Sequence, residues 1–349
     1  MMRKETHQFI EDFDKHLISP WNAGQQIDPS AWKHYISALP YIYNKDIAFR
    51  LLFDWHFDRS NHVGNSSILV EGVDMEDSFF LALVELINGI GKNIYRSDYQ
   101  FRELMLCHAR VNLRGKRILE VGGIMSNEIL FDLFGISEYI NIESPDYIHL
   151  TENGVPISDG FQAHENKRTI LCNAEEICMH LDPNSLDLVF SVACFEHIHD
   201  LKKALRSMHS CLTKGGTLYS YFAPIYSELR EGDHGVIPKH NLLPEKPVGF
   251  HLLSQNDQYR KLIELGINDP NEIQDFLERL NLNRTPNRFL YEDYERILTE
   301  SPFWVLELHR LDSFNISKDF PDIVSNIRES NPSIGNLMTI GFRTLLLKN

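Results

Sequence analysis

The stretch RILEVGGIMSNEIL, residues 117–130, decides the fold of this chain. A short apolar run ends on two glycines, and a segment with helical spacing follows them. Four similar runs lie further along: YINIE at 139–143, RTILCN at 168–173, LDLVFSVACF at 186–195 and TLYSYFAP at 217–224. Helical or turn-rich intervals separate the runs, which predicts β-α-β units and a parallel sheet. Because the runs are nearly continuously apolar, we expect strands that are covered on both faces.

Later segments extend this pattern toward the C-terminus. LKKALRSMHSCL at 201–212 predicts an amphipathic helix, followed by a turn at Lys214, Gly215 and Gly216. A stretch rich in Gly, Pro and His then runs from Pro224 to about Phe250. Helices are predicted after it at 254–266, 271–280 and 291–301. Two late apolar runs, FWVLELHRL at 303–311 and LMTIGFRTLLLK at 337–348, predict two more strands.

The first 110 residues have a different texture, because apolar positions recur there at helical spacing. DSFFLALVELINGIG at 77–91 and YQFRELMLCHARV at 99–111 both follow this spacing. The aromatic side chains between positions 32 and 57 could cover a ligand, or they could pack into the core of a helical cap. The aromatics concerned are Trp32, Tyr35, Tyr41, Tyr43, Phe53, Trp55 and Phe57.

Composition limits the classes of function. The chain has 349 residues, of which 43% are hydrophobic and 24% charged, and its formal net charge is −15. Such acidity argues against broad attraction to nucleic acid or to an anionic membrane, since both need a cationic face. Five cysteines without a CxxC pair predict reduced, mostly buried thiols. The N-terminus lacks the apolar run of a signal peptide, and residues 79–90 are too short to span a bilayer. We expect a cytoplasmic protein.

Polar residues at the strand ends predict a nucleoside site. Gly122 and Gly123 allow a tight turn and a close approach of the backbone to a ligand, and Glu120 on that turn can accept hydrogen bonds. Glu143 ends the second strand; an acid about 20 residues beyond a glycine turn can bind both hydroxyls of a ribose. Asn173 and Ala174 follow the third strand and could hold an adenine edge. Each of these residues alone could be an ordinary polar residue at a strand end, but their order along the chain favours a nucleoside-binding site.

At this point the chain resembles the class I S-adenosylmethionine-dependent methyltransferases. The resemblance lies in LDLVFSVACFEH and LTKGGTLYSYFAP, and it covers the run from Arg117 to Pro224. It implies a Rossmann-like, doubly wound, mostly parallel sheet of seven strands with an antiparallel terminal hairpin. The domain organisation that follows is a helical cap region at 1–110 and a class I methyltransferase domain at 111–349, with an insertion at about 226–300.

The resemblance also implies roles for single residues. Glu120, Gly122 and Gly123 would line the methionine end of S-adenosylmethionine, and Glu143 would bind its ribose. Asn173 and Ala174 would flank the adenine, and Ser191 would pass beneath the sulfonium. The first motif departs from the family pattern at two positions, because Ile124 and Ser126 stand where further glycines are usual.

Methyl transfer from a sulfonium needs mainly alignment and exclusion of water. A base helps only when the acceptor begins as a hydroxyl or an ammonium group. The candidates are His197 and His199 after the fourth strand and His234 after the fifth. Asp233 or Glu196 could orient the ring of the base. We rank His234 first, since Glu196-His197 recurs in the resembling families whatever their substrates. The histidines show no spacing diagnostic of zinc, so no metal site is predicted.

We therefore predict a methyltransferase that acts on an oxygen, nitrogen or carbon of a small molecule, such as a natural-product intermediate. Neither nucleic acid nor membrane is expected as a partner, and no feature specifies an oligomeric state. One alternative is a non-catalytic nucleoside-binding or interaction protein that keeps the same fold. A nicotinamide-dependent oxidoreductase would need G-x-G-x-x-G at the first turn, and the run Gly122 to Ser126 does not supply it.

Overall fold

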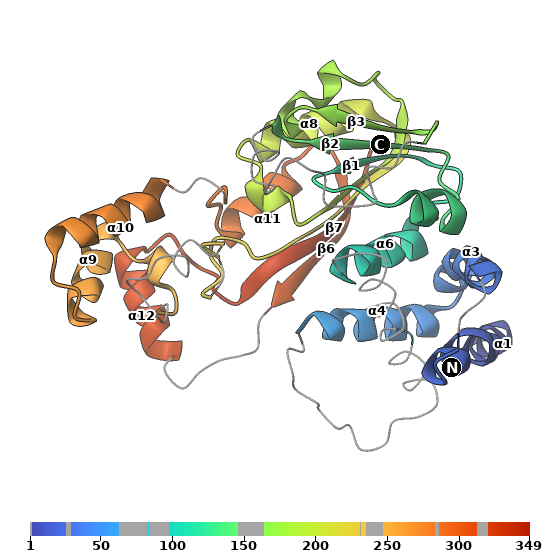
Figure 1. Cartoon of the computed structure of the whole chain (residues 1–349), viewed down its shortest axis with the longest axis horizontal. Coiled ribbons are helices and arrows are strands. Elements are labelled where there is room, and N and C mark those ends of the chain that lie inside the picture. Colours follow the sequence, from blue (N-terminus) through green and yellow to red (C-terminus); the bar gives the residue numbers. More distant parts are fainter. Residues whose placement is uncertain are drawn as a thin grey trace. The chain divides into compact units, whose positions relative to one another are not determined.

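The computed structural model describes residues 2–25, 29–62, 83, 98–145, 164–230, 232–234, 247–282, 286–312 and 320–349. Seven strands form one sheet in the order β3-β2-β1-β4-β5-β7-β6 (Figure 1). Their bounds are Arg117–Val121 (β1), Glu138–Glu143 (β2), Lys167–Leu171 (β3), Leu186–Val192 (β4), Leu212–Phe222 (β5), Trp304–Asp312 (β6) and Thr339–Leu347 (β7). β1 and β2 are parallel, whereas β7 runs antiparallel to both β5 and β6. The predicted mostly parallel sheet with an antiparallel terminal pair is confirmed.

The burial of each strand follows its place in the sheet. β1, β2 and β4 are almost entirely buried, as their continuous apolar sequences predict. β3 is largely exposed, because it is the first strand in the sheet order and has a neighbour on one side only. β6, at the other end of the order, leaves Trp304, Val305 and Leu306 exposed. The expectation of strands covered on both faces, made for the five runs between residues 117 and 224, therefore fails at β3.

The turn predicted at Lys214–Gly216 lies inside β5 instead of before it. Gly215 has a φ of +80°, a value that glycine adopts without steric cost. Its amide donates to the carbonyl of Lys348 at 2.8 Å, and the Lys348 amide donates back to the carbonyl of Gly216 at 2.9 Å. Hydrogen bonds to the end of the chain therefore continue the strand through a sequence that alone favours a turn.

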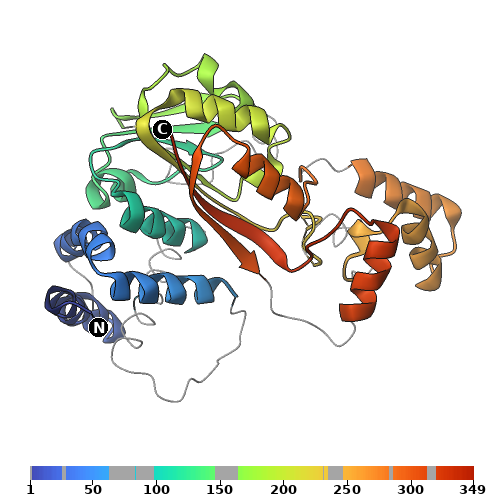
Figure 2. The ribbon, with the colours of Figure 1, turned by 180° about the vertical axis from the view of Figure 1, so that it is seen from behind.

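The chain divides into two compact units, and the first comprises Met1–Ile170 with Leu186–Leu188. Its helices are α1 (Lys4–Phe13), α2 (Ser19–Asn22), α3 (Pro29–Lys45), α4 (Ile47–His62) and α6 (Asp98–Val111), with π-helical segments at Asp14–Ile18 and Glu128–Leu133. α3 contacts both α4 and α6 (Figures 1 and 2). The helix predicted at 99–111 is confirmed as α6, while the one predicted at 77–91 lies, apart from Leu83, outside the described residues.

Aromatic side chains build much of the core of this helical region. Trp32, Tyr35, Tyr43 and Phe53 are buried. The ring centroid of Phe13 lies 6.2 Å from that of Trp32 and 5.1 Å from that of Tyr35, and Tyr43 and Phe53 are 5.7 Å apart. These four aromatics therefore pack into their own core, whereas Tyr41 is exposed; the side chains of Trp55 and Phe57 lie outside the described set.

The second unit comprises Leu171–Ser185 and Val189–Asn349. Its helices are α8 (Leu201–Cys211), α9 (Gln255–Glu264), α10 (Pro270–Leu282), α11 (Tyr291–Thr299) and α12 (Phe320–Ser330), with short 3-10 turns at Ala174–Met179, Phe195–His197 and Phe250–Leu252. The helices predicted at 201–212, 254–266, 271–280 and 291–301 are confirmed.

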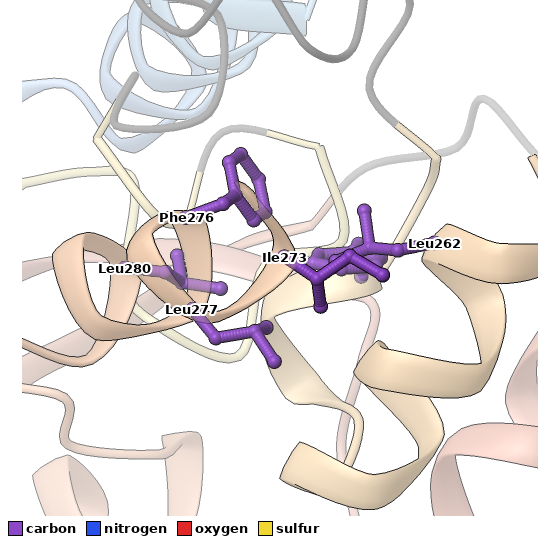
Figure 3. Packing of buried hydrophobic residues seen from close by; sticks show 6 residues of the cluster. Leu262, Ile273, Phe276, Leu277 and Leu280 are labelled. Atoms are coloured by element: carbon purple, nitrogen blue, oxygen red, sulfur yellow. The ribbon is translucent and has the colours of Figure 1, made fainter. Parts of the chain in front are cut away.

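Within this unit, α9 and α10 bury a small apolar cluster of their own. Leu262 of α9 lies among side chains of α10, which presents one apolar face (Figure 3). The α10 residues of the cluster are Ile273, Phe276, Leu277 and Leu280, and Phe250 joins them from the preceding 3-10 turn. The spacing of the four α10 side chains is that of one helix face. The helices α9 and α10 thus share a hydrophobic cluster to which no described strand residue of the sheet contributes.

All five cysteines are free, as predicted. Cys107, Cys172 and Cys211 are buried and Cys194 is partly buried, but Cys178 is exposed. Among the helices that the structure describes, none combines the length and the apolar character needed to cross a membrane.

Candidate functional site

Glu120 is the last residue but one of β1, and the two glycines begin the turn that follows this strand in the first unit. Gly122 has a φ of +80°, which a side chain would strain. A Cβ atom at Gly123 would lie 2.5 Å from Oε1 of Glu120 and 3.2 Å from Nε2 of Gln100. The carboxyl of Glu120 therefore rests directly on the backbone of Gly123. This close approach is the local reason for the second glycine.

Glu120 is buried near the end of β1, in the strand and not on the turn as predicted, and one of its oxygens has a protein partner. Oε2 accepts a short hydrogen bond from the Tyr139 hydroxyl, while Oε1 has no hydrogen-bond partner among the described residues. Burial raises the pKa of Glu120 to about 8, although the Tyr139 hydrogen bond opposes the rise. A buried oxygen without a partner is costly, and an incoming donor would remove that cost. The arrangement fits a ligand with an ammonium or hydroxyl group.

Glu143 lies at the end of β2 and is half-buried. The side-chain amide of Asn141 donates to its Oε1 at 3.4 Å. Burial also raises the pKa of the Glu143 carboxyl, and its charge contributes to the raised pKa of Glu120. A carboxylate in such surroundings gains from a pair of hydroxyl donors, as the predicted ribose contact requires.

Two further predicted cofactor residues begin a short 3-10 turn of the second unit, directly after β3. Asn173 precedes the turn in extended conformation and is half-buried, and Ala174 is buried as its first residue. Ser191 is buried near the end of β4. The structure thus places all three at strand ends, as predicted from the sequence.

The same unit brings the two candidate histidines side by side. The ring centroids of His197 and His234 are 4.8 Å apart, with the planes inclined at 71°. His197 ends the 3-10 turn after β4, and His234 follows β5 with a φ of +52°. His199, in contrast, is exposed. Adjacent imidazoles from two loops can share the task of moving a proton.

Hydrogen bonding defines the proton position on His234. Its Nε2 lies 2.9 Å from the carbonyl oxygen of Pro224, and a carbonyl can only accept, so Nε2 carries the hydrogen. In the neutral ring the basic nitrogen is then Nδ1. The neighbouring Asp233 is also buried. The tautomer suits a group that accepts a proton through Nδ1.

Glu196, a candidate for orienting the ring of the base, lies in surroundings that favour its neutral form. Its side chain is buried, and its Oε2 has no hydrogen-bond partner among the described residues. Burial raises the pKa of Glu196 to about 8. The carboxyl therefore keeps its proton at neutral pH and cannot act there as a charged partner for His197 or His234.

Sequence reasoning missed two polar side chains at the glycine turn. Lys167 at the start of β3 donates from Nζ to the carbonyl of Met125 at 2.6 Å and to Oδ1 of Asn127 at 3.2 Å. Tyr139 of β2 accepts from the Met125 amide at 3.2 Å. Tyr139 lies inside an apolar run of the sequence and Lys167 lies just before one. Neither run predicts these contacts, because the contacts join segments that are distant in sequence.

No group of three or more His, Cys, Asp or Glu side chains that could hold a metal ion occurs in the part of the chain that the structure describes.

Comparison with known proteins adds a family match. Residues 148–220 match the family described as a methyltransferase domain. This match spans β3, β4 and most of β5, and it begins after Glu120 and the turn that carries Gly123. No curated protein matches the sequence.

Several solved structures resemble the chain at low identity. Phosphoethanolamine N-methyltransferase 2 of Haemonchus contortus, in complex with S-adenosyl-L-methionine, is 14% identical with a TM-score of 0.40, over 76% of this chain and 56% of that one. Geranyl diphosphate C-methyltransferase of Streptomyces coelicolor is 10% identical with a TM-score of 0.39, over 82% and 88%. An S-adenosylmethionine-dependent methyltransferase of Mesorhizobium loti is 14% identical with a TM-score of 0.34, over 68% and 92%. At these values the likeness specifies neither substrate nor site residues.

The sheet order is that of a Rossmann-like, mostly parallel fold with an antiparallel terminal pair, and residues 148–220 within it match a methyltransferase domain. The matched domain indicates an enzyme that transfers a methyl group.

Proposed function

We propose that this protein transfers a methyl group from S-adenosylmethionine to an oxygen, nitrogen or carbon of a small molecule. The observation that carries the proposal is the pair His197 and His234, whose rings lie 4.8 Å apart on the loops after β4 and β5. A base at this position serves an acceptor that begins as a hydroxyl or an ammonium group. His234 is the base in this proposal, and His197 supports its ring.

The surroundings of His234 support this role. Its Nε2 hydrogen is engaged by the Pro224 carbonyl, so Nδ1 is the nitrogen that takes the proton from the acceptor. Glu196 is neutral at neutral pH, because burial raises its pKa to about 8, and it acts in this proposal as a buried hydrogen donor. Proximity then aligns the acceptor with the sulfonium, which is already activated for displacement.

The cofactor contacts proposed here follow the strand ends. Glu120 and the backbone of Gly122 and Gly123 receive the methionine part, and Glu143 accepts from both ribose hydroxyls. Asn173 and Ala174 flank the adenine, and Ser191 lies beneath the sulfonium. The orphaned Oε1 of Glu120 supports the first of these contacts, since an ammonium group would supply its missing donor.

A small-molecule acceptor is favoured by the charge of the chain. A net charge of −15 opposes binding of nucleic acid, whose phosphates require Lys and Arg contacts.

Radioactive methyl transfer tests the proposal even though the acceptor is unidentified. The protein is incubated with cell extract and S-adenosylmethionine tritiated in its methyl group, and the products are separated by dialysis into small molecules and macromolecules. We expect tritium in new dialysable products, and much less of it with the Glu143→Ala variant at a low concentration of S-adenosylmethionine. Label that appears only in retained nucleic acid or protein would refute the small-molecule acceptor.

A further inference from the structure

The first turn of this chain lacks the later glycines of the family pattern, since Ile124 and Ser126 occupy their positions. Glycine-rich turns reach their shape because small residues let the backbone approach its neighbours. A turn with larger residues needs another source of rigidity. In this structure the contacts of Met125, which lies between those two positions, supply it.

Met125 is held through both ends of its backbone by side chains from two different strands. Its amide donates to the hydroxyl oxygen of Tyr139, on β2, at 3.2 Å. Its carbonyl accepts from Nζ of Lys167, on β3, at 2.6 Å, and the same ammonium donates to Oδ1 of Asn127 at 3.2 Å. The Met125 side chain is itself buried. Charged donors make shorter and stronger hydrogen bonds than neutral ones, so Lys167 is the stronger of the two restraints.

The same two side chains also define the surroundings of Glu120. The Tyr139 hydroxyl donates to Oε2 of Glu120, which leaves Oε1 as the oxygen that rests on Gly123. The Lys167 ammonium lies 5.6 Å from the centre of the Tyr139 ring, a distance at which a cation is attracted to the ring face. Lys167, Tyr139, Glu120 and the Met125 backbone therefore form one connected network within the first unit.

We propose that Lys167 is a positioning residue for the cofactor: it holds the turn after β1 in the shape that receives the methionine part of S-adenosylmethionine, in place of the absent glycines. This inference rests on the proposed cofactor contacts of Glu120 and Gly123. Lys167 acts through the Met125 carbonyl and Asn127, and it does not touch the ligand. Its effect is therefore confined to ligands that carry the amino-acid part.

Two ligands that differ in that part test the inference by calorimetry. S-adenosylmethionine carries the methionine part, whereas 5′-methylthioadenosine keeps the adenosine and the sulfur but lacks the amino-acid group. We expect Lys167→Met to weaken the binding of S-adenosylmethionine by about tenfold, the usual effect of losing a charge-assisted hydrogen bond. Binding of 5′-methylthioadenosine should be unchanged. Lys167→Arg should recover part of the loss, because a guanidinium can also donate to the Met125 carbonyl.

Lys33→Met is the matched control, since Lys33 is an exposed lysine of the same unit. Equal binding of S-adenosylmethionine by Lys167→Met and wild type would overturn the inference and leave the proposed function intact. A variant that loses both ligands would also overturn it, because the role of Lys167 would then be structural. A wild-type protein that binds neither ligand would overturn the proposed cofactor contacts as well.

Discussion

Replacing Glu196 with Gln should remove a pH dependence of stability that the buried carboxyl creates. Glu196 has a pKa of about 8 in the folded chain against an ordinary value of 4.5, and burial causes the rise. The folded state therefore keeps a proton that the unfolded state releases. The stability that this proton supports is complete below pH 4.5 and is lost as the pH rises toward 8. Glutamine has no such titration.

The size of the effect follows from the two pKa values. Each pH unit inside the window costs about 1.4 kcal/mol, so the wild type should lose about 2.5 kcal/mol between about pH 5.5 and pH 7.5 through this group. Glu120 also has a raised pKa and adds a loss in the same direction. Because Glu120 is present in both proteins, the difference between wild type and Glu196→Gln isolates Glu196.

Urea unfolding at several pH values measures this difference. With a slope of about 3 kcal/mol per molar urea, the gap between the two midpoints should change by about 0.8 M across that pH interval. Glutamine also alters hydrogen bonding at the site, which shifts all midpoints equally and leaves the pH trend intact. A gap that stays constant from about pH 5.5 to pH 7.5 would mean that Glu196 titrates in its ordinary range. The neutral role assigned to it here would then be wrong.

The other predictions concern the cofactor and the base. Glu143→Ala should weaken S-adenosylmethionine binding by about 1–3 kcal/mol, the cost of unpaired ribose hydroxyls; an unchanged dissociation constant in a folded variant would assign the ribose to another acid. Gly123→Ala should cost about 1–3 kcal/mol of stability, because the new Cβ would lie 2.5 Å from Oε1 of Glu120, and thermal unfolding should reveal it; an unaltered melting curve would contradict the tight contact. Once an acceptor is known, His234→Ala should lower turnover by roughly 10²–10⁴-fold with little change in cofactor affinity, whereas replacing the exposed His199 should do much less. The wild-type rate should fall below about pH 6–7, where an imidazole takes up a proton, and identical pH profiles for wild type and His234→Ala would exclude the base.

The secondary structure was largely predictable because its signals are local. Continuous apolar runs such as 117–121 and 186–192 became buried strands, and the helical spacing in 201–212 became α8. The prediction failed where a distant segment decided the outcome. Gly215 and Gly216 favour a turn by themselves, but hydrogen bonds to Lys348 extend β5 through them.

The candidate site divides in the same way. The sequence was enough to select four of its residues, because each lies at or just after the end of a recognisable strand: Glu120, Gly122, Gly123 and Glu143. The hydrogen bond from Lys167 to the Met125 carbonyl could not be predicted from the sequence, since the two residues belong to segments separated by β2. An apolar run predicts a strand, but it does not predict which side chains of two strands will contact each other.

The sequence alone therefore determined where strands and helices form, since apolar spacing and glycine conformations act between near neighbours. Only the tertiary structure decided which strands lie at the edges, which carboxyls keep their protons, and which histidines stand together. His197 and His234 approach each other because the loops after β4 and β5 bring them together. Burial of Glu196 likewise arises from packing, and burial sets its pKa. These properties depend on contacts between distant segments, which no local pattern encodes.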